Sequence, residues 1–117
     1  MVKVAVLVYT DTDTLEDMGR VMNALETAKE FKENGDEIRL IFDGAGTQWI
    51  PELEAESHRL HPLYRTVKDD IQVCDYCADE FHVADAVADH GVEIIAEYDG
   101  HPSIRSLVLE GYEVITI

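Results

Sequence analysis

The apolar residues follow an order that predicts alternating strands and helices. Residues 2–9 form an almost unbroken β-branched and apolar run, which is typical of a strand covered on both faces. A stretch of Thr and Asp residues follows. Apolar residues then recur at helical spacing, which predicts a helix over 15–33 that ends at Gly35. Residues 37–42 form the next predicted strand, and the glycines in 43–47 permit a tight turn after it.

The second half of the chain continues this alternation with shorter elements. Residues 48–70 are expected to be helical in two pieces, over about 51–57 and about 62–68, because a proline stands at the start of each piece. The remaining apolar runs predict three strands and two helices. These are the strands 71–73, 92–96 and 112–117 and the helices 78–88 and 102–110.

This order of elements predicts an α/β fold. Strands that alternate with helices form parallel sheets whose two faces are covered by the connecting helices. We therefore expect a three-layer α/β/α arrangement with a mainly parallel five-stranded sheet. The length of 117 residues fits one domain over residues 1–117, because a second hydrophobic core needs more chain.

Polar and glycine-bearing segments follow the predicted strands. In an open parallel sheet the carboxyl ends of the strands lie along one edge, where loops and helix N-termini meet and ligands bind. The sequence therefore predicts one site at that edge. The segments expected there are Tyr9-Thr10-Asp11, Asp43-Gly44, Cys74 to Cys77, and Tyr98 to Ser103.

The two cysteines of the chain are the strongest chemical signal. Cys74 and Cys77 are separated by two residues at a predicted strand-to-helix junction, so their sulfur atoms can meet across one helical turn. A helix N-terminus favours thiolate over thiol, which makes a nucleophilic sulfur plausible here. Asp75, Asp79 and Glu80 act in the opposite direction, so the sequence leaves the direction of the thiol pKa shift open.

Packing and metal binding are the other roles open to this pair. Buried cysteines often serve only as small apolar side chains. A structural zinc site needs four ligands, so His82, His101 or an acidic residue would have to complete the pair, and no metal is expected. His101 is expected at the mouth of the site, where it can exchange a proton or cap a helix. His58 and His61 are expected on the surface, and His82 on the side of a helix.

No segment of the chain has the pattern of a nucleotide-binding loop. Asp43-Gly44-Ala45-Gly46 has too few glycines and lacks the Lys-Ser or Lys-Thr ending of a phosphate loop. The carboxylate of Asp43 would also repel a phosphate group. We therefore expect no cofactor.

The segments at the sheet edge resemble those of the DsrE/DsrF-like family, whose members are small three-layer α/β proteins and include sulfur-relay subunits. The resemblance extends over nearly the whole chain. The resemblance rests on the segments Tyr9 to Thr14, Leu40 to Thr47, Cys74-Asp75-Tyr76-Cys77-Ala78 and Gly100-His101-Pro102-Ser103. It implies a DsrE-like fold with flavodoxin-like layering.

For the site, this resemblance implies a sulfur-handling role of Cys74. In the sulfur-relay members one cysteine after the third strand carries sulfur as a persulfide, and Cys74 occupies the similar position. Cys77 is an addition that the relay subunits do not generally require, and it can act as a resolving thiol by attacking the persulfide. The residues expected to shape the site around this pair are Thr10, Asp11, Asp43, Gly44, Tyr76 and His101.

Two other functions stay open beside sulfur transfer. One is a binding or oligomerisation module without turnover, and the other is a CxxC thiol-disulfide oxidoreductase, although the flanking sequence and the order of elements differ from those of thioredoxin. The resemblance also implies partners. We expect a homo-oligomer in which apolar residues such as Trp49 are buried between subunits, and a protein that donates or accepts sulfur.

The charge and the apolar runs exclude several classes of partner. The chain has 25 acidic and 9 basic residues and a net charge of −16, which disfavours nucleic acid and anionic membranes. The longest apolar runs, such as Val4 to Val8, are far shorter than the roughly 20 residues of a membrane-spanning helix. The N-terminus has no signal-peptide pattern, so we expect a cytoplasmic protein.

We interpret the net charge as adaptation to high salt, and we predict that lowering the ionic strength destabilises the fold. Folding concentrates like charges, and the Debye length grows from roughly 3 Å at 1 M salt to roughly 30 Å at 0.01 M. Thermal melts followed by circular dichroism at neutral pH, across this range of potassium chloride, test the prediction. A melting temperature that stays constant or falls as salt rises identifies an acidic protein without salt adaptation.

Overall fold

A five-stranded parallel sheet forms the centre of the molecule. The computed structural model describes residues 1–117 and places the strands in the order β4-β3-β2-β1-β5. Every neighbouring pair is parallel, which confirms the expected α/β class. The strands are β1 (Lys3–Val8), β2 (Glu37–Phe42), β3 (Ile71–Cys74), β4 (Glu93–Ile95) and β5 (Glu113–Thr116).

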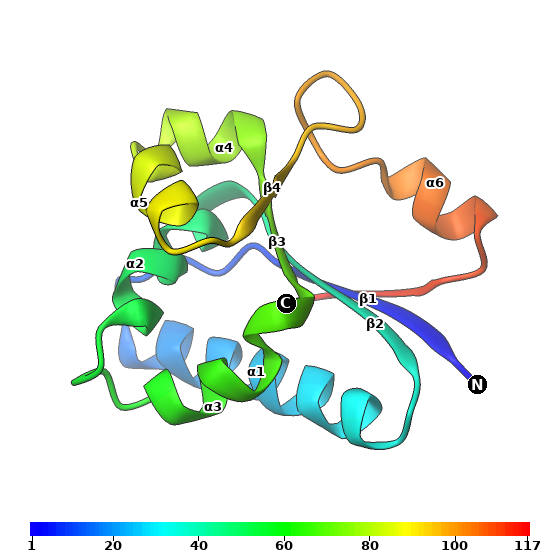
Figure 1. Ribbon diagram of the computed structural model, residues 1–117, viewed down its shortest axis with the longest axis horizontal. Helices are drawn as coiled ribbons and strands as arrows, with labels where there is room; N and C mark the ends of the chain where they lie inside the picture. The colour runs from blue at the N-terminus through cyan, green and yellow to red at the C-terminus, as the bar shows by residue number, and fades with distance from the viewer.

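Helices cover the two faces of the sheet unequally. Five of them, α1 to α5, pack against one face in a large core, whereas α6 lies alone on the other face (Figure 1). The α-helices are α1 (Leu15–Glu33), α2 (Trp49–Glu54), α3 (His61–Val67), α4 (Asp75–Glu80), α5 (Ala84–Asp89) and α6 (Ile104–Leu109). Two 3-10 turns, η1 (Gly44–Gln48) and η2 (Lys68–Asp70), precede α2 and follow α3. No helix combines the length and the apolar character that crossing a bilayer requires.

The central place of β1 in the sheet explains its unbroken apolar run. The strand lies between β2 and β5, and its residues from Val4 to Val8 have no exposed surface. Val4, Val6 and Val8 face the large core, and Ala5 and Leu7 face the smaller core beside α6. Because side chains alternate between the faces of a strand, burial on both faces leaves no position for a polar residue.

The first helix begins and ends where the sequence predicts. The Thr14 hydroxyl accepts the Asp17 backbone N–H at 3.1 Å, and the Asp17 carboxylate accepts the Thr14 N–H at 3.0 Å, which completes a capping box. The chain leaves α1 through Asn34 and Gly35, whose φ of 78° lies in the left-handed region. Local chemistry therefore defines both ends of α1.

The single helix expected over 78–88 is wrong, because two short helices occupy this part of the chain. His82 lies between α4 and α5 with a φ of 59°, which interrupts the helix. The Val83 N–H donates to the Ala78 carbonyl at 2.8 Å and closes the end of α4. His82 is therefore an exposed residue of a turn, and its expected place on the side of a helix is also wrong.

Other predicted boundaries shift by a few residues for local reasons. The helical piece expected over about 51–57 begins earlier, at Trp49, and ends at Glu54. The last helix begins at Ile104 and not at residue 102, because the Ser103 hydroxyl accepts the Ser106 N–H at 3.1 Å and caps the helix. Strands β1, β4 and β5 are each one residue shorter than predicted at both ends.

Trp49 belongs to the core of its own chain. Its side chain is 2% exposed, and its indole N–H donates to the Thr10 carbonyl at 2.9 Å. The expectation that Trp49 is buried between subunits is therefore wrong. His58 packs edge-on against this indole, and His61 Nδ1 lies 2.7 Å from the Leu53 carbonyl oxygen, so both histidines are half-buried and not on the open surface as expected.

The sheet face beside α6 carries a polar network that crosses three strands. Arg39 shares this face with the buried Ile41, because alternate residues of a strand point to the same side. Arg39 Nε donates to Gln72 Oε1 at 2.7 Å, and Gln72 Nε2 donates to Glu93 Oε2 at 2.9 Å. Arg39 also pairs with Glu97 at 3.3 Å. The network thereby ties the loop after β4 to the sheet.

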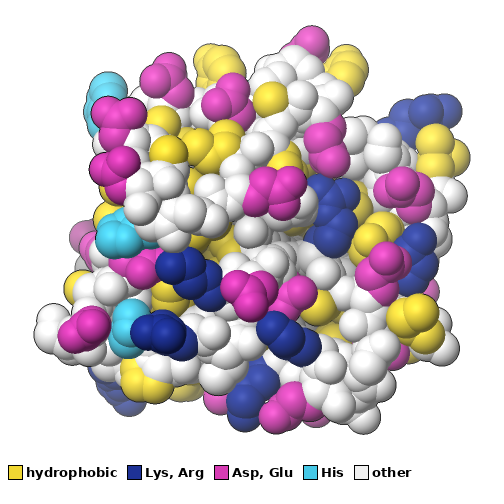
Figure 2. Space-filling model, in the orientation of Figure 1, with side chains coloured by type: hydrophobic (Ala, Val, Ile, Leu, Met, Phe, Trp, Pro, Cys, Tyr) yellow, Lys and Arg dark blue, Asp and Glu magenta, His cyan; other side chains and the backbone are white.

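Acidic side chains are spread over the visible face of the molecule without forming one patch (Figure 2). Figure 2 shows Asp and Glu side chains over the whole visible face, with Lys and Arg between them. Three of the seven ion pairs have both side chains exposed, such as Arg20 with Glu16 at 2.8 Å in α1. Exposed pairs contribute little to stability, and the net charge of −16 is the excess of acidic over basic residues that no pairing removes.

Replacing Gly46 by alanine is predicted to destabilise the fold. Gly46 lies in η1 against the end of β1, and a Cβ atom there would lie 2.1 Å from the Val8 carbonyl oxygen. The two backbone segments must then separate, and overpacking of this kind typically costs about 1–3 kcal/mol. Urea unfolding at fixed salt measures the loss of free energy of unfolding.

Gly19→Ala in α1 is the matched control for this substitution. A Cβ atom at Gly19 meets nothing within 4 Å, and alanine has the higher helix propensity, so this variant is expected to be at least as stable as the parent chain. Equal free energies of unfolding for Gly46→Ala and the parent chain would show that the close approach at Gly46 is unimportant.

Candidate functional site

Four side chains that can transfer protons or bind metal meet at the carboxyl edge of the sheet. Asp43 follows β2, Cys74 ends β3, Cys77 lies in the first turn of α4, and His101 follows β4. Each residue offers one ligand atom, and these four atoms lie within 4.8 Å of one another. Of the residues expected at this edge, the structure therefore brings four into one cluster.

Cys74 is held at the junction between β3 and α4. Its Sγ accepts the Cys77 backbone N–H at 3.5 Å, which makes Cys74 the N-cap of α4. The same sulfur lies 3.4 Å from His101 Nδ1 and 3.7 Å from the Gly100 carbonyl oxygen. Cys74 has no exposed surface, whereas Cys77 is half-buried. A reagent in solution therefore reaches Cys77 more readily than Cys74.

A tight turn after β4 positions His101. Asp99 and Gly100 have φ values of 49° and 83°, and the flanking Tyr98 and His101 exchange two backbone N–H···O bonds at 2.8 Å. Positive φ at both central residues is the type I′ pattern, for which Asp-Gly is a favoured pair. The Gly100 carbonyl also accepts the Tyr76 N–H at 2.9 Å, which fastens the turn to α4.

Contacts on two sides hold the His101 loop in place. The Tyr76 and His101 rings lie with their centroids 4.7 Å apart and their planes at 37°, so Tyr76 packs against the imidazole. On the sheet side, Glu97 Oε1 accepts the Ser103 N–H at 3.0 Å while Glu97 pairs with Arg39. Tyr76 of α4 thus orients the imidazole, and Glu97 with Arg39 ties the loop that carries it to the sheet.

Asp43 places a buried carboxylate beside Cys77. Its Oδ1 accepts the Gly44 N–H at 2.8 Å and the Cys77 S–H at 3.3 Å. Asp43 is only 8% exposed, and it takes part in none of the ion pairs of the chain. Buried charges are generally paired or coordinate a metal, so this carboxylate without a cationic partner marks the site as unusual.

Burial raises the pKa of both thiols. For Cys74 the loss of hydration is the largest cause, the Cys77 N–H acts in the opposite direction, and Asp43 raises the pKa further. Burial is also the largest cause of the raised pKa of Cys77, and the hydrogen bond to Asp43 adds to it. The direction that the sequence leaves open is therefore upward. The raised pKa values favour the thiol form of both sulfurs at neutral pH.

Tyr9 belongs to the same site, although no chemical motif includes it. It directly follows β1 and is 41% exposed. Its ring lies against the loop after β2, because a Cβ atom on Gly44 would lie 3.6 Å from Tyr9 Cδ1. Burial raises the pKa of its phenol, and the charges of Asp43, Cys74 and Cys77 raise it further. The sequence indicates this place because Tyr9 ends the predicted first strand and belongs to a segment expected at the sheet edge.

Thr10 and Asp11 support the site from outside the cluster. The Trp49 indole N–H lies 2.9 Å from the Thr10 carbonyl and 3.2 Å from the Asp11 carbonyl, and Gln48 Nε2 donates to the Asp11 carboxylate at 3.0 Å. These bonds fix η1 and α2 against the end of β1. Gly44 contributes its backbone N–H to the site.

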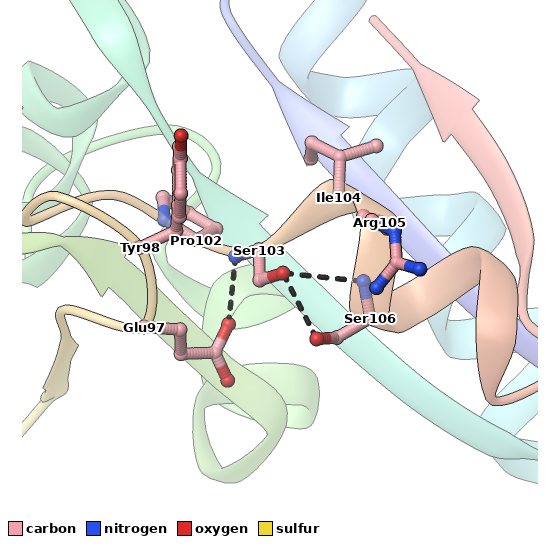
Figure 3. A pocket seen from close by; sticks show the side chains of 7 residues that line it. All are labelled: Glu97, Tyr98, Pro102, Ser103, Ile104, Arg105 and Ser106. Carbon is pink, nitrogen blue, oxygen red and sulfur yellow. Dashed lines mark hydrogen bonds between the residues drawn. The ribbon is translucent and has the colours of Figure 1, made fainter.

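A hollow of about 610 Å³ opens beside the His101 loop (Figure 3). Ser103 lies in its lining and makes two hydrogen bonds there. Its hydroxyl accepts the Ser106 N–H, and its backbone N–H donates to the Glu97 carboxylate. The residues that line it are Glu97, Tyr98, Pro102, Ser103, Ile104, Arg105 and Ser106. None of the four clustered side chains is among them, so the hollow adjoins the site without including it.

The clustered side chains also form one set of possible metal ligands. Two sulfurs, one imidazole nitrogen and one carboxylate oxygen are available. Asp43 and His101 add two possible ligands to the cysteine pair. His82 lies exposed between α4 and α5 and is not part of the set. The structure thus brings together four possible zinc ligands, which the sequence alone does not show.

Comparisons with known proteins agree with this fold. The family model described as the DsrE/DsrF-like family matches residues 3–117. An uncharacterized protein of Methanocaldococcus jannaschii is 32% identical over 116 residues, which cover 98% of this chain and 95% of that protein. A conserved protein of unknown function from Bacteroides thetaiotaomicron has a similar structure, with a TM-score of 0.67 at 19% identity, covering 98% of this chain and 95% of the other. Neither description names a reaction.

Replacing Asp43 by asparagine is predicted to make Cys77 more reactive at neutral pH. The Asp43 carboxylate raises the pKa of the Cys77 thiol, so its removal lowers that pKa and increases the thiolate fraction. Asparagine keeps an oxygen that can accept the Gly44 N–H, so the fold is retained. We expect alkylation of Cys77 by iodoacetamide to be several times faster, as measured by peptide mass spectrometry.

Asp79→Asn is the control for this substitution, because it removes the same charge from an exposed position in α4. Its alkylation rate should match that of the parent chain. If Asp43→Asn reacts no faster than Asp79→Asn, the carboxylate does not control the Cys77 thiol.

Proposed function

The chain belongs to the DsrE/DsrF-like family, and on that premise we propose that it carries sulfane sulfur as a persulfide on Cys74, with Cys77 as the resolving thiol. The observation that carries the proposal is the meeting of both sulfurs with a base and a carboxylate in one cluster. Cys74 also has the position that carries sulfur in the sulfur-relay members it resembles. The burial of Cys74 would shield a persulfide from reagents in solution.

Loading requires removal of the Cys74 proton and access for the donor. His101 Nδ1 lies 3.4 Å from Cys74 Sγ and is placed to accept that proton. The thiolate then attacks the terminal sulfur of a polysulfide, a new S–S bond forms on Cys74, and the shortened polysulfide leaves with the electron pair of the broken bond. Because Cys74 is fully buried, this step needs a local opening of the site edge.

Discharge uses the second thiol. The Cys77 thiolate attacks Cys74 Sγ, the persulfide bond breaks, and sulfide leaves with its electron pair, so that a disulfide between Cys74 and Cys77 remains. A thiol reductant then restores both cysteines. Asp43 holds the Cys77 proton in the resting state through the 3.3 Å contact, which slows premature discharge because the thiolate is the attacking form.

The proposal also includes partners. A donor or acceptor protein would approach the edge of the site, where the hollow beside the His101 loop is available. We further propose a homo-oligomer that covers the thin α6 layer, where Val108 and Leu109 are 62% and 66% exposed. Light scattering at high salt tests this assembly, and a monomer contradicts it.

Cys74→Ser is predicted to abolish sulfur loading, whereas Cys77→Ser is predicted to load and to keep its persulfide several times longer than the parent chain. The first variant lacks the accepting sulfur, and the second lacks the thiol that expels sulfide. Intact mass spectrometry after incubation with polysulfide in the presence of a chelator, followed over time, measures both outcomes. A gain of one sulfur identifies the persulfide.

His82→Gln is the control, because His82 is exposed and outside the cluster. Equal loss of loading in both cysteine variants would refute the division of roles. A loss of two hydrogens without sulfur gain in the parent chain would instead indicate a thiol-disulfide oxidoreductase, and no mass change at all would indicate a binding module.

A further inference from the structure

We propose that Asp43, Cys74, Cys77 and His101 bind one zinc ion in the reduced protein. The set offers two sulfurs, one imidazole nitrogen and one carboxylate oxygen, contributed by α4 and by the segments that end or follow three strands. Structural zinc sites take four ligands of these kinds in tetrahedral geometry.

The spacing of the ligand atoms matches such a site. With Zn–S bonds of about 2.3 Å and Zn–N or Zn–O bonds of about 2.0–2.2 Å, a sulfur and a neighbouring nitrogen or oxygen of a tetrahedron lie about 3.5 Å apart. Cys74 Sγ lies 3.4 Å from His101 Nδ1, and Cys77 Sγ lies 3.3 Å from Asp43 Oδ1. All four atoms lie within 4.8 Å of one another, so small side-chain movements complete the geometry.

The charge of Asp43 gives an independent indication. Its carboxylate is 8% exposed, lacks a cationic partner, and belongs to a chain of net charge −16. Coordination would place a cation in direct contact with this buried carboxylate, although two thiol protons leave at the same time. When zinc binds, two thiol protons leave as two Zn–S bonds form, so the site carries one negative charge both before and after binding.

The surroundings of the cluster suit zinc better than a hard cation. The Cys77 N–H donates to Cys74 Sγ, the Gly44 N–H donates to Asp43 Oδ1, and Tyr76 packs against the His101 ring, so each of these contacts orients a ligand. Two sulfur ligands disfavour magnesium and calcium, which prefer oxygen. Cys77 and His101 are only partly buried, which leaves an entry path.

Zinc and sulfane sulfur would compete for the same two sulfurs. This consequence rests on the proposed sulfur-carrier function, whereas zinc binding itself does not. In a cell, zinc would thus protect the reduced thiols and prevent sulfur loading until the metal is removed. The two proposals are tested separately, because the zinc experiment contains no sulfur donor and the sulfur experiment contains a chelator.

A cobalt and zinc titration of the reduced protein tests the site. The protein is treated with chelator, exchanged into metal-free buffer without oxygen, titrated with Co²⁺ and then with Zn²⁺. We expect one equivalent of cobalt to bind, with a thiolate-to-cobalt charge-transfer band and with visible bands typical of tetrahedral cobalt. Both sets of bands should disappear when zinc displaces the cobalt. Absence of the charge-transfer band, or a stoichiometry other than one, overturns the proposal.

Substitutions identify the ligands. Asp43→Asn and His101→Gln should each weaken zinc affinity more than tenfold in competition with a chromophoric chelator, because loss of even an outer partner of a ligand typically costs about 10–100-fold. Cys77→Ser should lose part of the charge-transfer intensity, and His82→Gln should bind as the parent chain does. Circular dichroism confirms folding of each variant before titration. Unchanged affinity in both Asp43→Asn and His101→Gln overturns the four-ligand set.

Discussion

The parallel register of β2, β3 and β4 is the constraint on which the site depends. Phe42 pairs with Val73 and Cys74 pairs with Ile95, so the three strands end at nearly the same level. The residues that follow these ends therefore arrive at one edge, although they are far apart in the sequence. The close backbone approach of η1 to β1 at Gly46 keeps the Asp43 loop at that level.

The same arrangement determines the chemistry of the sulfurs. Burial of the strand ends removes water from the thiols, which raises their pKa, and the Asp43 carboxylate acts in the same direction. A reaction at Cys74 therefore needs a partner that takes the proton. His101, held 3.4 Å away by the turn after β4, is placed to take that proton.

Local signals allowed much of the fold to be predicted, and what was missed has one local and one long-range cause. The cap of α1 at Thr14 and its end at Gly35 are readable from neighbouring residues, as is the strand that delivers Cys74. The break at His82 is also local, but the apolar period continues through it and does not reveal the φ of 59° at His82 or the backbone bond from Val83 to Ala78 that ends α4. The contact of His101 with Cys74 depends on how the Asp-Gly turn folds back onto α4. The spacing of apolar residues along the chain does not predict how this turn packs.

The most direct test of the central claim is to locate the added sulfur within the unmodified protein. The chain is exposed briefly to polysulfide with a chelator present, alkylated at once, digested, and the peptide that contains both cysteines is fragmented in the mass spectrometer. The account predicts the extra sulfur on Cys74, the buried thiol beside His101. Sulfur found only on Cys77, or on neither cysteine, would contradict it.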